Sequence, residues 1–209
     1  MKIFLFITAS FLIIGCGSQA TEDGALVSVK KIPEITVNDY IYKLGEVTIK
    51  WTAFKHSAKA QVGGKFKSAD VKGFTESTNL STAISGVTFK IPVASTSTND
   101  EIRDYKIVNS FFNTMVDTDS ISGRILSIDE NGSGKLVINM NGQEVEKQYK
   151  WEMDQTNKEI YLKTSIDVLN WGAQSSLDAL NEVCLEQHTG PDGKNVLWPN
   201  VDITVIVEL

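Results

Sequence analysis

The stretch Lys135–Asp154, KLVINMNGQEVEKQYKWEMD, decides the fold of this chain. Its first part has apolar side chains at every second position, namely Leu136, Ile138 and Met140. Asn141-Gly142 follows, and this dipeptide is typical of a two-residue β-hairpin turn, because both turn positions need a positive φ. The alternation then resumes, with apolar residues at Val145, Tyr149, Trp151 and Met153. The stretch therefore predicts two antiparallel strands that each bury one face.

The same alternation recurs along most of the chain. It is seen in the segments 47–53, 87–93, 160–168 and 201–209, and turn residues such as Asp129–Gly132 separate such runs. About eight antiparallel strands are expected, and closing them into one sheet would remove the exposed edges that invite aggregation. The pattern predicts a mainly β protein, and alternation by itself leaves a barrel and a sandwich open.

Two stretches break the alternation and predict one or two short helices. Thr98–Glu101 has the form of a capping box, in which a Thr hydroxyl and a Glu carboxylate bind free amide groups at a helix start. The apolar residues that follow recur at helical spacing, at Ile102, Tyr105, Val108 and Phe112. A second helix is expected from about Ser175, with an apolar stripe at Leu177, Leu180 and Cys184.

The N-terminus has the parts of an export signal. Lys2 supplies a positive charge, Ile3–Ile14 is largely apolar, and Gly15 precedes Cys16. The apolar run is shorter than the roughly 20 residues that a membrane-spanning helix needs, so it predicts a secretory signal peptide. The sequence before Cys16 resembles the bacterial lipobox, which implies cleavage before Cys16 and acylation of that residue. The expected organisation is a signal peptide over residues 1–15, a lipidated Cys16 and tether over 16–36, and one β-barrel domain over 37–209.

Gly17 bears on where such a lipoprotein would reside. An aspartate at this position marks inner-membrane retention in well-studied Gram-negative bacteria, and the sequence has glycine there. We therefore expect a protein of the cell envelope, anchored in the outer membrane through Cys16 and facing the periplasm. Two or more acyl chains make a stable anchor, since each buried methylene contributes ~0.8 kcal/mol.

Composition and residue spacing argue against several classes of function. The chain has 20 basic and 26 acidic side chains, a net charge of −6 and no basic run, which argues against binding of nucleic acid. Its two histidines, His56 and His188, lack metal-ligand spacing. Ser57 stands beside His56, but neighbouring residues of a strand point to opposite faces, so the two do not form a nucleophile and its base. Once Cys16 carries the anchor, Cys184 is a lone thiol, which we expect to be buried and inert rather than reactive. We expect no metal site, no cofactor and no catalytic residue.

A series of short motifs resembles the YceI-like lipid-binding family. Ser95–Thr98 is followed by Arg103-Asp104 and then by Phe111-Phe112, in the order that the family shows. Val62–Phe66 is similar to the family's second strand, and Trp198-Pro199 precedes a final alternating strand. The resemblance covers roughly residues 40–209. At the position where the family commonly has a histidine, three residues after the arginine, this chain has Lys106.

The resemblance implies a closed, lipocalin-like antiparallel β-barrel of about eight strands around an elongated apolar cavity. It implies a polyisoprenoid, a quinone tail or a fatty-acid-like lipid as ligand, held for carriage or sequestration without chemistry. Related barrels can pair, so a homodimer is a further expectation. The alternative is a non-enzymatic structural or interaction lipoprotein of the cell envelope, whose barrel is filled by its own side chains.

The residues expected to contact such a ligand are aromatic or lie next to the motifs. They are Trp51, Phe54, Phe89, Ile91, Arg103, Phe111, Phe112, Tyr149 and Trp151. Each ring has an alternative role in filling the interior or packing the helix against the sheet. Arg103 and Asp104 could orient a polar head group, or could form a structural pair that fixes the helix, since a charge in the wall of a barrel must be paired.

Overall fold

The computed structural model describes residues 40–117 and 119–209, which belong to a compact unit that runs from Asn38 to Leu209. The predicted signal peptide, Cys16 and the tether lie outside the described residues. Within the described part of the chain, no helix is long and apolar enough to cross a membrane.

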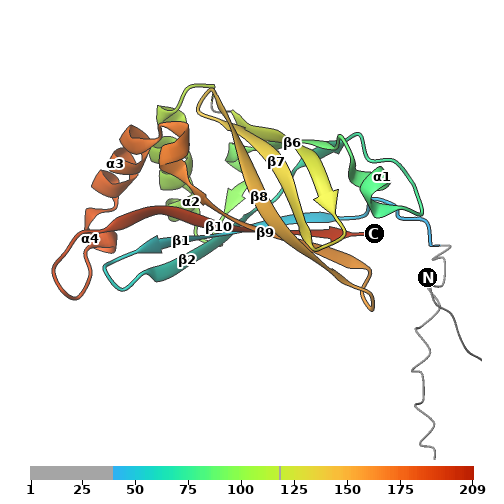
Figure 1. Cartoon of the computed structure of the whole chain (residues 1–209). Coiled ribbons are helices and arrows are strands. Elements are labelled where there is room, and N and C mark those ends of the chain that lie inside the picture. Colours follow the sequence, from blue (N-terminus) through green and yellow to red (C-terminus); the bar gives the residue numbers. More distant parts are fainter. Residues whose placement is uncertain (1–39, 118) are drawn as a thin grey trace, which may run out of the picture. The chain divides into compact units, whose positions relative to one another are not determined.

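Ten strands form a single sheet in which all neighbours are antiparallel. They are β1 (Val47–Lys55), β2 (Ala60–Phe66), β3 (Asp70–Lys72), β4 (Thr88–Pro92), β5 (Thr96–Ser97), β6 (Ser120–Asp129), β7 (Ser133–Met140), β8 (Gln143–Asp154), β9 (Glu159–Asp167) and β10 (Leu197–Glu208). Their order in the sheet is β3-β4-β6-β7-β8-β9-β10-β1-β2-β5, and the sheet curls into a half-barrel (Figure 1). The prediction of a mainly β, antiparallel fold is confirmed.

The structure has a ten-stranded sheet in place of the expected closed barrel of about eight strands, because the short strands β3 and β5 continue β2 and β4 after an interruption. β2 is followed at once by β3, and β4 leads through the 3-10 turn η1 (Val93–Ser95) into β5. Pro92 ends the β4 ladder, since proline has no N–H to donate. The strand order therefore ends at β3 and β5, which are not paired with each other.

The two interrupted segments still face each other, since β2 pairs with β5 and β3 pairs with β4. Phe66 pairs with Thr96 and Asp70 pairs with Lys90, so three residues on one side (67–69) oppose five on the other (91–95). A hydrogen bond from the Lys67 amide to the carbonyl of Ser95 (2.9 Å) bridges the gap between the two ladders.

Short helices lie at both ends of the sheet. They are α1 (Leu80–Ile84), α2 (Glu101–Lys106), α3 (Gln174–Val183) and α4 (Leu185–His188), with the π-helix η2 (Ile107–Phe111) and the 3-10 turns η3 (Phe112–Thr114) and η4 (Val168–Trp171). α3 and α4 lie at one end, near β1 and β2, and α1 lies at the other end, near the C-terminus (Figure 1). The sequence did not predict α1.

The start of α2 differs from the prediction. Its N-cap is Asp100, whose carboxylate accepts a hydrogen bond from the Arg103 amide (3.0 Å). Thr98 instead donates both its amide (2.7 Å) and its hydroxyl (2.6 Å) to the Asp104 carboxylate. This anchor turns the Asp104 side of α2 toward the sheet, so the predicted apolar face is wrong at its start, although Phe112 at its far end is buried. Ile102 and Tyr105 are 73% and 69% exposed.

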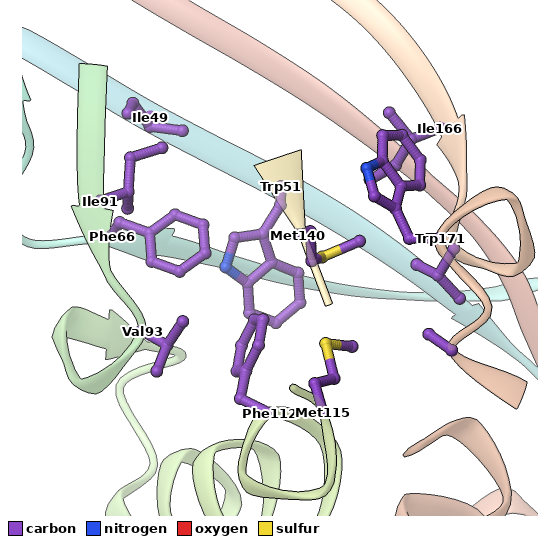
Figure 2. Close-up of a cluster of buried hydrophobic side chains, with 12 residues drawn as sticks. Ile49, Trp51, Phe66, Ile91, Val93, Phe112, Met115, Met140, Ile166 and Trp171 are labelled. Atoms are coloured by element: carbon purple, nitrogen blue, oxygen red, sulfur yellow. The ribbon is translucent and has the colours of Figure 1, made fainter. Parts of the chain in front are cut away.

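A cluster of buried apolar side chains lies where the sheet meets the segment that follows α2. Figure 2 shows Trp51 and Phe66 beside each other, with Met140, Met115 and Phe112 next to them. The cluster also contains Ile49, Ile91, Val93, Ile166, Val168, Trp171 and Ala173. The interior of the sheet is therefore partly filled at this level.

Three inward aromatic rings each lie over a glycine of the neighbouring strand. Trp51 pairs with Gly64, Phe89 with Gly123 and Tyr149 with Gly134. A Cβ atom at any of these glycines would overlap the ring opposite. The glycines thus let the rings lie against the wall of the sheet, and cross-strand pairs of this kind stabilise a sheet by about 0.2–1 kcal/mol.

The substitution Gly64→Ala tests this packing. We expect it to lower the free energy of unfolding by about 1–3 kcal/mol, as overpacking of a core does, because the Trp51 ring must move. The measurement is urea denaturation followed by tryptophan fluorescence. The matched control is Gly63→Ala, where the new Cβ meets only the Trp51 carbonyl oxygen at 3.9 Å; we expect a change within about 0.5 kcal/mol. Equal losses in the two variants would contradict the packing role.

Candidate functional site

A first cavity of about 170 Å³ lies inside the curved sheet. Side chains from every strand except β5 line it, and Phe74, Ile84 and Leu209 lie at its α1 end. Its lining contains only two residues with hydroxyl groups, Tyr149 and Thr164. Both hydroxyls donate to main-chain carbonyls, of Ser127 (2.7 Å) and Gln148 (2.8 Å) respectively. This cavity therefore offers an apolar surface with no spare side-chain hydrogen-bonding group.

Tyr149 shows how apolar this cavity is. Its side chain is 2% exposed. Burial, and to a smaller extent the charge of Asp129, raise the pKa of the Tyr149 phenol above its ordinary value. The phenol therefore stays neutral and serves to close the wall rather than to transfer a proton.

A second apolar cavity, of about 130 Å³, continues the first. The two cavities share five lining residues, Phe66, Ile121, Met140, Ile166 and Ile203. On its other side the second cavity is covered by helical residues, among them Ile107, Phe111, Phe112, Leu177 and Leu180. Only a partition of apolar side chains separates the two spaces.

A third cavity, of about 240 Å³, has a mixed lining. It shares Trp51, Ala53, Ile107, Leu180 and Leu197 with the second cavity. Its charged lining residues are Lys55 from β1 and Asp100, Arg103 and Lys106 from the start of α2 and α2 itself, with His188 from α4 beside them. The three cavities thus run from an apolar interior to a polar end.

Local features of the chain shape this polar end. The β1–β10 register shifts between Ala53 and Lys55, and such irregularities redirect side chains near the end of a strand. Lys106 and Ile107 lie three and four residues after Arg103, so both are neighbours of Arg103 on the surface of the helix. The π-helix η2 then continues toward Phe111, and π-helical turns are frequent at functional sites.

The predicted site residues divide among the three cavities. Phe89, Ile91 and Tyr149 line the first, and Phe111 and Phe112 line the second. Trp51 lies between the second and the third, and Phe54 and Arg103 line the third.

Trp151 lines none of the three cavities. Its indole N–H donates to the carbonyls of Asp129 (2.9 Å) and Ser133 (3.1 Å). Trp151 therefore fixes the turn between β6 and β7.

Sequence reasoning missed Lys55 and Lys106 as site residues. Lys55 ends a strand whose inward face is otherwise apolar, and Lys106 lies outside the apolar stripe predicted for the helix. Their approach to one cavity follows from the tertiary structure, which brings α2 and the end of β1 to the same cavity, and is not encoded in local spacing. The one available signal was that lysine occupies the position of the family's common histidine.

Two further predictions concern the thiol and metals. Cys184 is 7% exposed and is a free cysteine, as expected, and it contributes to the third cavity. Among the described residues there is no cluster of three or more His, Cys, Asp and Glu side chains that would hold a metal ion.

His188 is a buried neutral base at the edge of the third cavity. Its Nδ1 lies 2.8 Å from Oδ1 of Asn181, whose Nδ2 donates to Asn195. Because the Asn181 oxygen can only accept, Nδ1 carries the proton. Burial, followed by the positive charges of Lys55, His56 and Lys106, lowers the pKa of His188 from 6.5 to about 4.

This shift predicts a pH dependence of stability. Between pH 6.5 and about 4 the unfolded chain binds a proton at His188 that the folded chain does not, so the free energy of unfolding falls as the pH is lowered through this range. Urea denaturation at several pH values, compared between the native chain and His188→Gln, measures the effect. We expect a shallower slope in the variant, and identical slopes would contradict the buried neutral state. A titration of the His188 ring by NMR gives the pKa directly.

No family model matches the chain, and no curated protein is significantly similar to it in sequence. The polyisoprenoid-binding domain from Saccharophagus degradans, implicated in plant cell wall breakdown, is similar in structure, with a TM-score of 0.55, 10% identity and coverage of 80% of this chain and 95% of that domain.

Two other solved structures are also similar. BcnA of Burkholderia cenocepacia has a TM-score of 0.52 and 10% identity, over 77% of this chain and 94% of BcnA. The YceI protein of Campylobacter jejuni has a lower TM-score of 0.44 and 17% identity, over 77% and 87% of the two chains. The chain therefore has the fold of the polyisoprenoid-binding domain and of BcnA, and its resemblance to the YceI-like family is confirmed at the level of the fold.

Proposed function

We propose that this protein is a YceI-like lipoprotein of the cell envelope that binds a long apolar molecule, such as a polyisoprenoid, a quinone tail or a fatty-acid-like lipid, for carriage or sequestration. The observation that carries the proposal is the succession of two apolar cavities inside the sheet, separated only by shared apolar side chains. A long chain that enters such a space gains about 0.8 kcal/mol for each buried methylene.

The cavities have the length that an extended ligand needs. β10 borders all three, from Leu197 beside the third and second cavities to Val207 beside the first. At about 3.3 Å per residue, these positions are separated by about 33 Å along the strand. The enclosed space is therefore long and narrow, which suits a chain better than a compact molecule.

The partition between the first two cavities is adaptable. Met140 belongs to it, and methionine has three rotatable bonds and no branch at Cβ, so it changes rotamer at low cost. A ligand would displace Met140 and its neighbours and join the two spaces. If the partition stayed closed instead, the interior would be a filled core, as in the alternative structural role.

We infer that the wall around the ligand is continuous although the strand order has two ends. β2 and β3 face β5 and β4, and the Lys67–Ser95 hydrogen bond spans the gap between them. A wall of this kind acts as a closed barrel toward its contents, which supports the lipocalin-like form expected from the resemblance.

The proposed role involves no chemistry. The two hydroxyl groups in the first cavity are donors to the main chain, and the second cavity is lined almost wholly by apolar residues. A nucleophile or general base would need a partner within hydrogen-bonding reach of the bound molecule, and the lining of these two cavities supplies no such pair.

The proposal is tested by native mass spectrometry and solvent extraction of the whole chain purified from bacteria. The Cys16→Ser variant is used, because it removes the acylation site, so that any lipid found is a bound ligand rather than the anchor. We expect a long-chain species at about one equivalent. A protein that arrives empty, and does not take up isoprenoid quinones or fatty acids, would favour the structural alternative.

Ile203→Phe tests where the ligand lies. Ile203 is part of the partition, so a larger ring there should block passage between the first two cavities. We expect uptake of a long-chain ligand to weaken at least about tenfold, which corresponds to about 1.4 kcal/mol. Thr204→Phe, at the adjacent residue on the outer face of β10, is the matched control and should bind normally. Equal affinities of the two variants would contradict ligand binding in the interior.

The membrane anchor is tested separately by fractionating cells that express the native chain or Cys16→Ser. We expect the native chain in the membrane fraction, with acyl chains on its N-terminal peptide in mass spectra, and no such acyl chains on the variant. A native chain whose N-terminal peptide carries no acyl chain would contradict an anchor at Cys16.

A further inference from the structure

The third cavity contains a concentration of positive charge. Its lining has three basic side chains, Lys55, Arg103 and Lys106, against one acidic side chain, Asp100. The chain as a whole carries a net charge of −6, so this excess runs against the composition of the protein. Such a local excess attracts anions and lowers the cost of removing them from water.

The acidic side chain in this lining is already engaged. The Asp100 carboxylate lies 3.4 Å from the Arg103 guanidinium, and it also caps the N-terminus of α2. Lys55 Nζ donates to the carbonyl of Gln187 (2.8 Å), a neutral acceptor, which leaves its charge uncompensated. Among the described residues, Lys106 forms no ion pair within 4.0 Å. Two positive charges are therefore free to meet an anion.

Lys55 and Lys106 come from different parts of the chain, but both line the third cavity and lie near His188. Both contribute to lowering the pKa of His188, which itself lines the cavity. Both are half-buried, and Lys106 and Ile107 are both neighbours of Arg103 on the surface of the helix. The helix therefore presents two cations beside a side chain, Ile107, that also lines the apolar second cavity.

The cavity is also open to solvent. The Arg103 side chain is 46% exposed, and Ile102, which is part of the lining, is 73% exposed. A polar group that rests here would be reached from outside, while a chain attached to it would pass Trp51 and Ile107 into the apolar interior. This arrangement matches a molecule with one charged end and one long apolar end.

We propose that the ligand is an anionic amphiphile, a long chain that ends in a carboxylate or phosphate, and that Lys55, Lys106 and Arg103 bind its head group in the third cavity while the chain fills the other two. This inference rests on the proposed function and specifies its ligand class. A neutral quinone or alcohol with the same chain would leave the cations without a partner. The protein therefore selects by the charge of the head group as well as by the chain.

Chain-matched probes test the proposal. Hexadecyl phosphate, palmitate and hexadecanol carry the same sixteen-carbon chain with different head groups, and their affinities are measured on the whole chain carrying Cys16→Ser by displacement of a fluorescent fatty-acid analogue. We expect the two anions to bind at least about tenfold more tightly than hexadecanol, since hydrogen bonds between charged groups are stronger than those between neutral ones. Higher salt should reduce this preference.

The variant Lys55→Gln/Lys106→Gln should lose the preference for anions and retain the affinity for hexadecanol. Lys50→Gln is the matched control, because Lys50 lies on the exposed outer face of the same strand as Lys55. It should behave as the native chain does. Circular dichroism of each variant checks that the fold is kept.

Each contrary result has a distinct meaning. Equal binding of all three probes by the native chain, or an unchanged preference in the double variant, would overturn the head-group site and leave the apolar cavities as the binding site. Displacement of hexadecyl phosphate by an equal concentration of inorganic phosphate would show a site for free anions and would overturn the amphiphile. Binding of none of the probes would overturn both the head-group site and the proposed function.

Discussion

The packing of aromatic rings against glycines is the constraint on which the interior depends. Each strand directs every second side chain inward, and in a sheet of this curvature large side chains on facing strands would meet in the centre. Trp51, Phe89 and Tyr149 avoid this because each ring lies over a glycine of the next strand. The rings thus thicken the wall and leave space along the axis, from which the first two cavities follow.

The same interior must keep its polar groups satisfied, because a lone donor in an apolar cavity costs free energy. The hydroxyls of Tyr149 and Thr164 meet main-chain carbonyls, and no buried side-chain polar atom of the described residues lacks a partner. Two lysines that form no ion pair among the described residues, Lys55 and Lys106, lie instead at the third cavity, which is open to solvent. The cavity linings therefore change from apolar to cationic along one direction, and under the proposed function this gradient would orient the ligand.

The segment from α2 to η3 lines both the apolar second cavity and the cationic third cavity. Its first part carries Arg103 and Lys106, and its last part carries Phe111 and Phe112 against the second cavity. The hold of Asp104 on Thr98 fixes which side of the helix turns inward. The Arg103-Asp104 pair of the motif therefore has divided roles: Asp104 positions the helix, and Arg103 remains at the opening of the cavity.

The sequence by itself determined the inward face of the sheet. Alternation at positions such as Ile49, Phe89, Ile138 and Ile203 predicted which side chains line the interior, because the pleat of a strand directs neighbouring residues to opposite faces. The local pattern did not predict the interruptions between β2 and β3 and between β4 and β5. It also did not predict which side of α2 faces the sheet, or that Lys55 and Lys106 line the same cavity. The interruptions depend on the pairing of residues far apart in the chain, which shifts by two residues between the Phe66–Thr96 and Asp70–Lys90 pairs. The orientation of α2 depends on the hydrogen bonds from Thr98 to Asp104. Tertiary structure alone therefore placed the cations at the end of the apolar space.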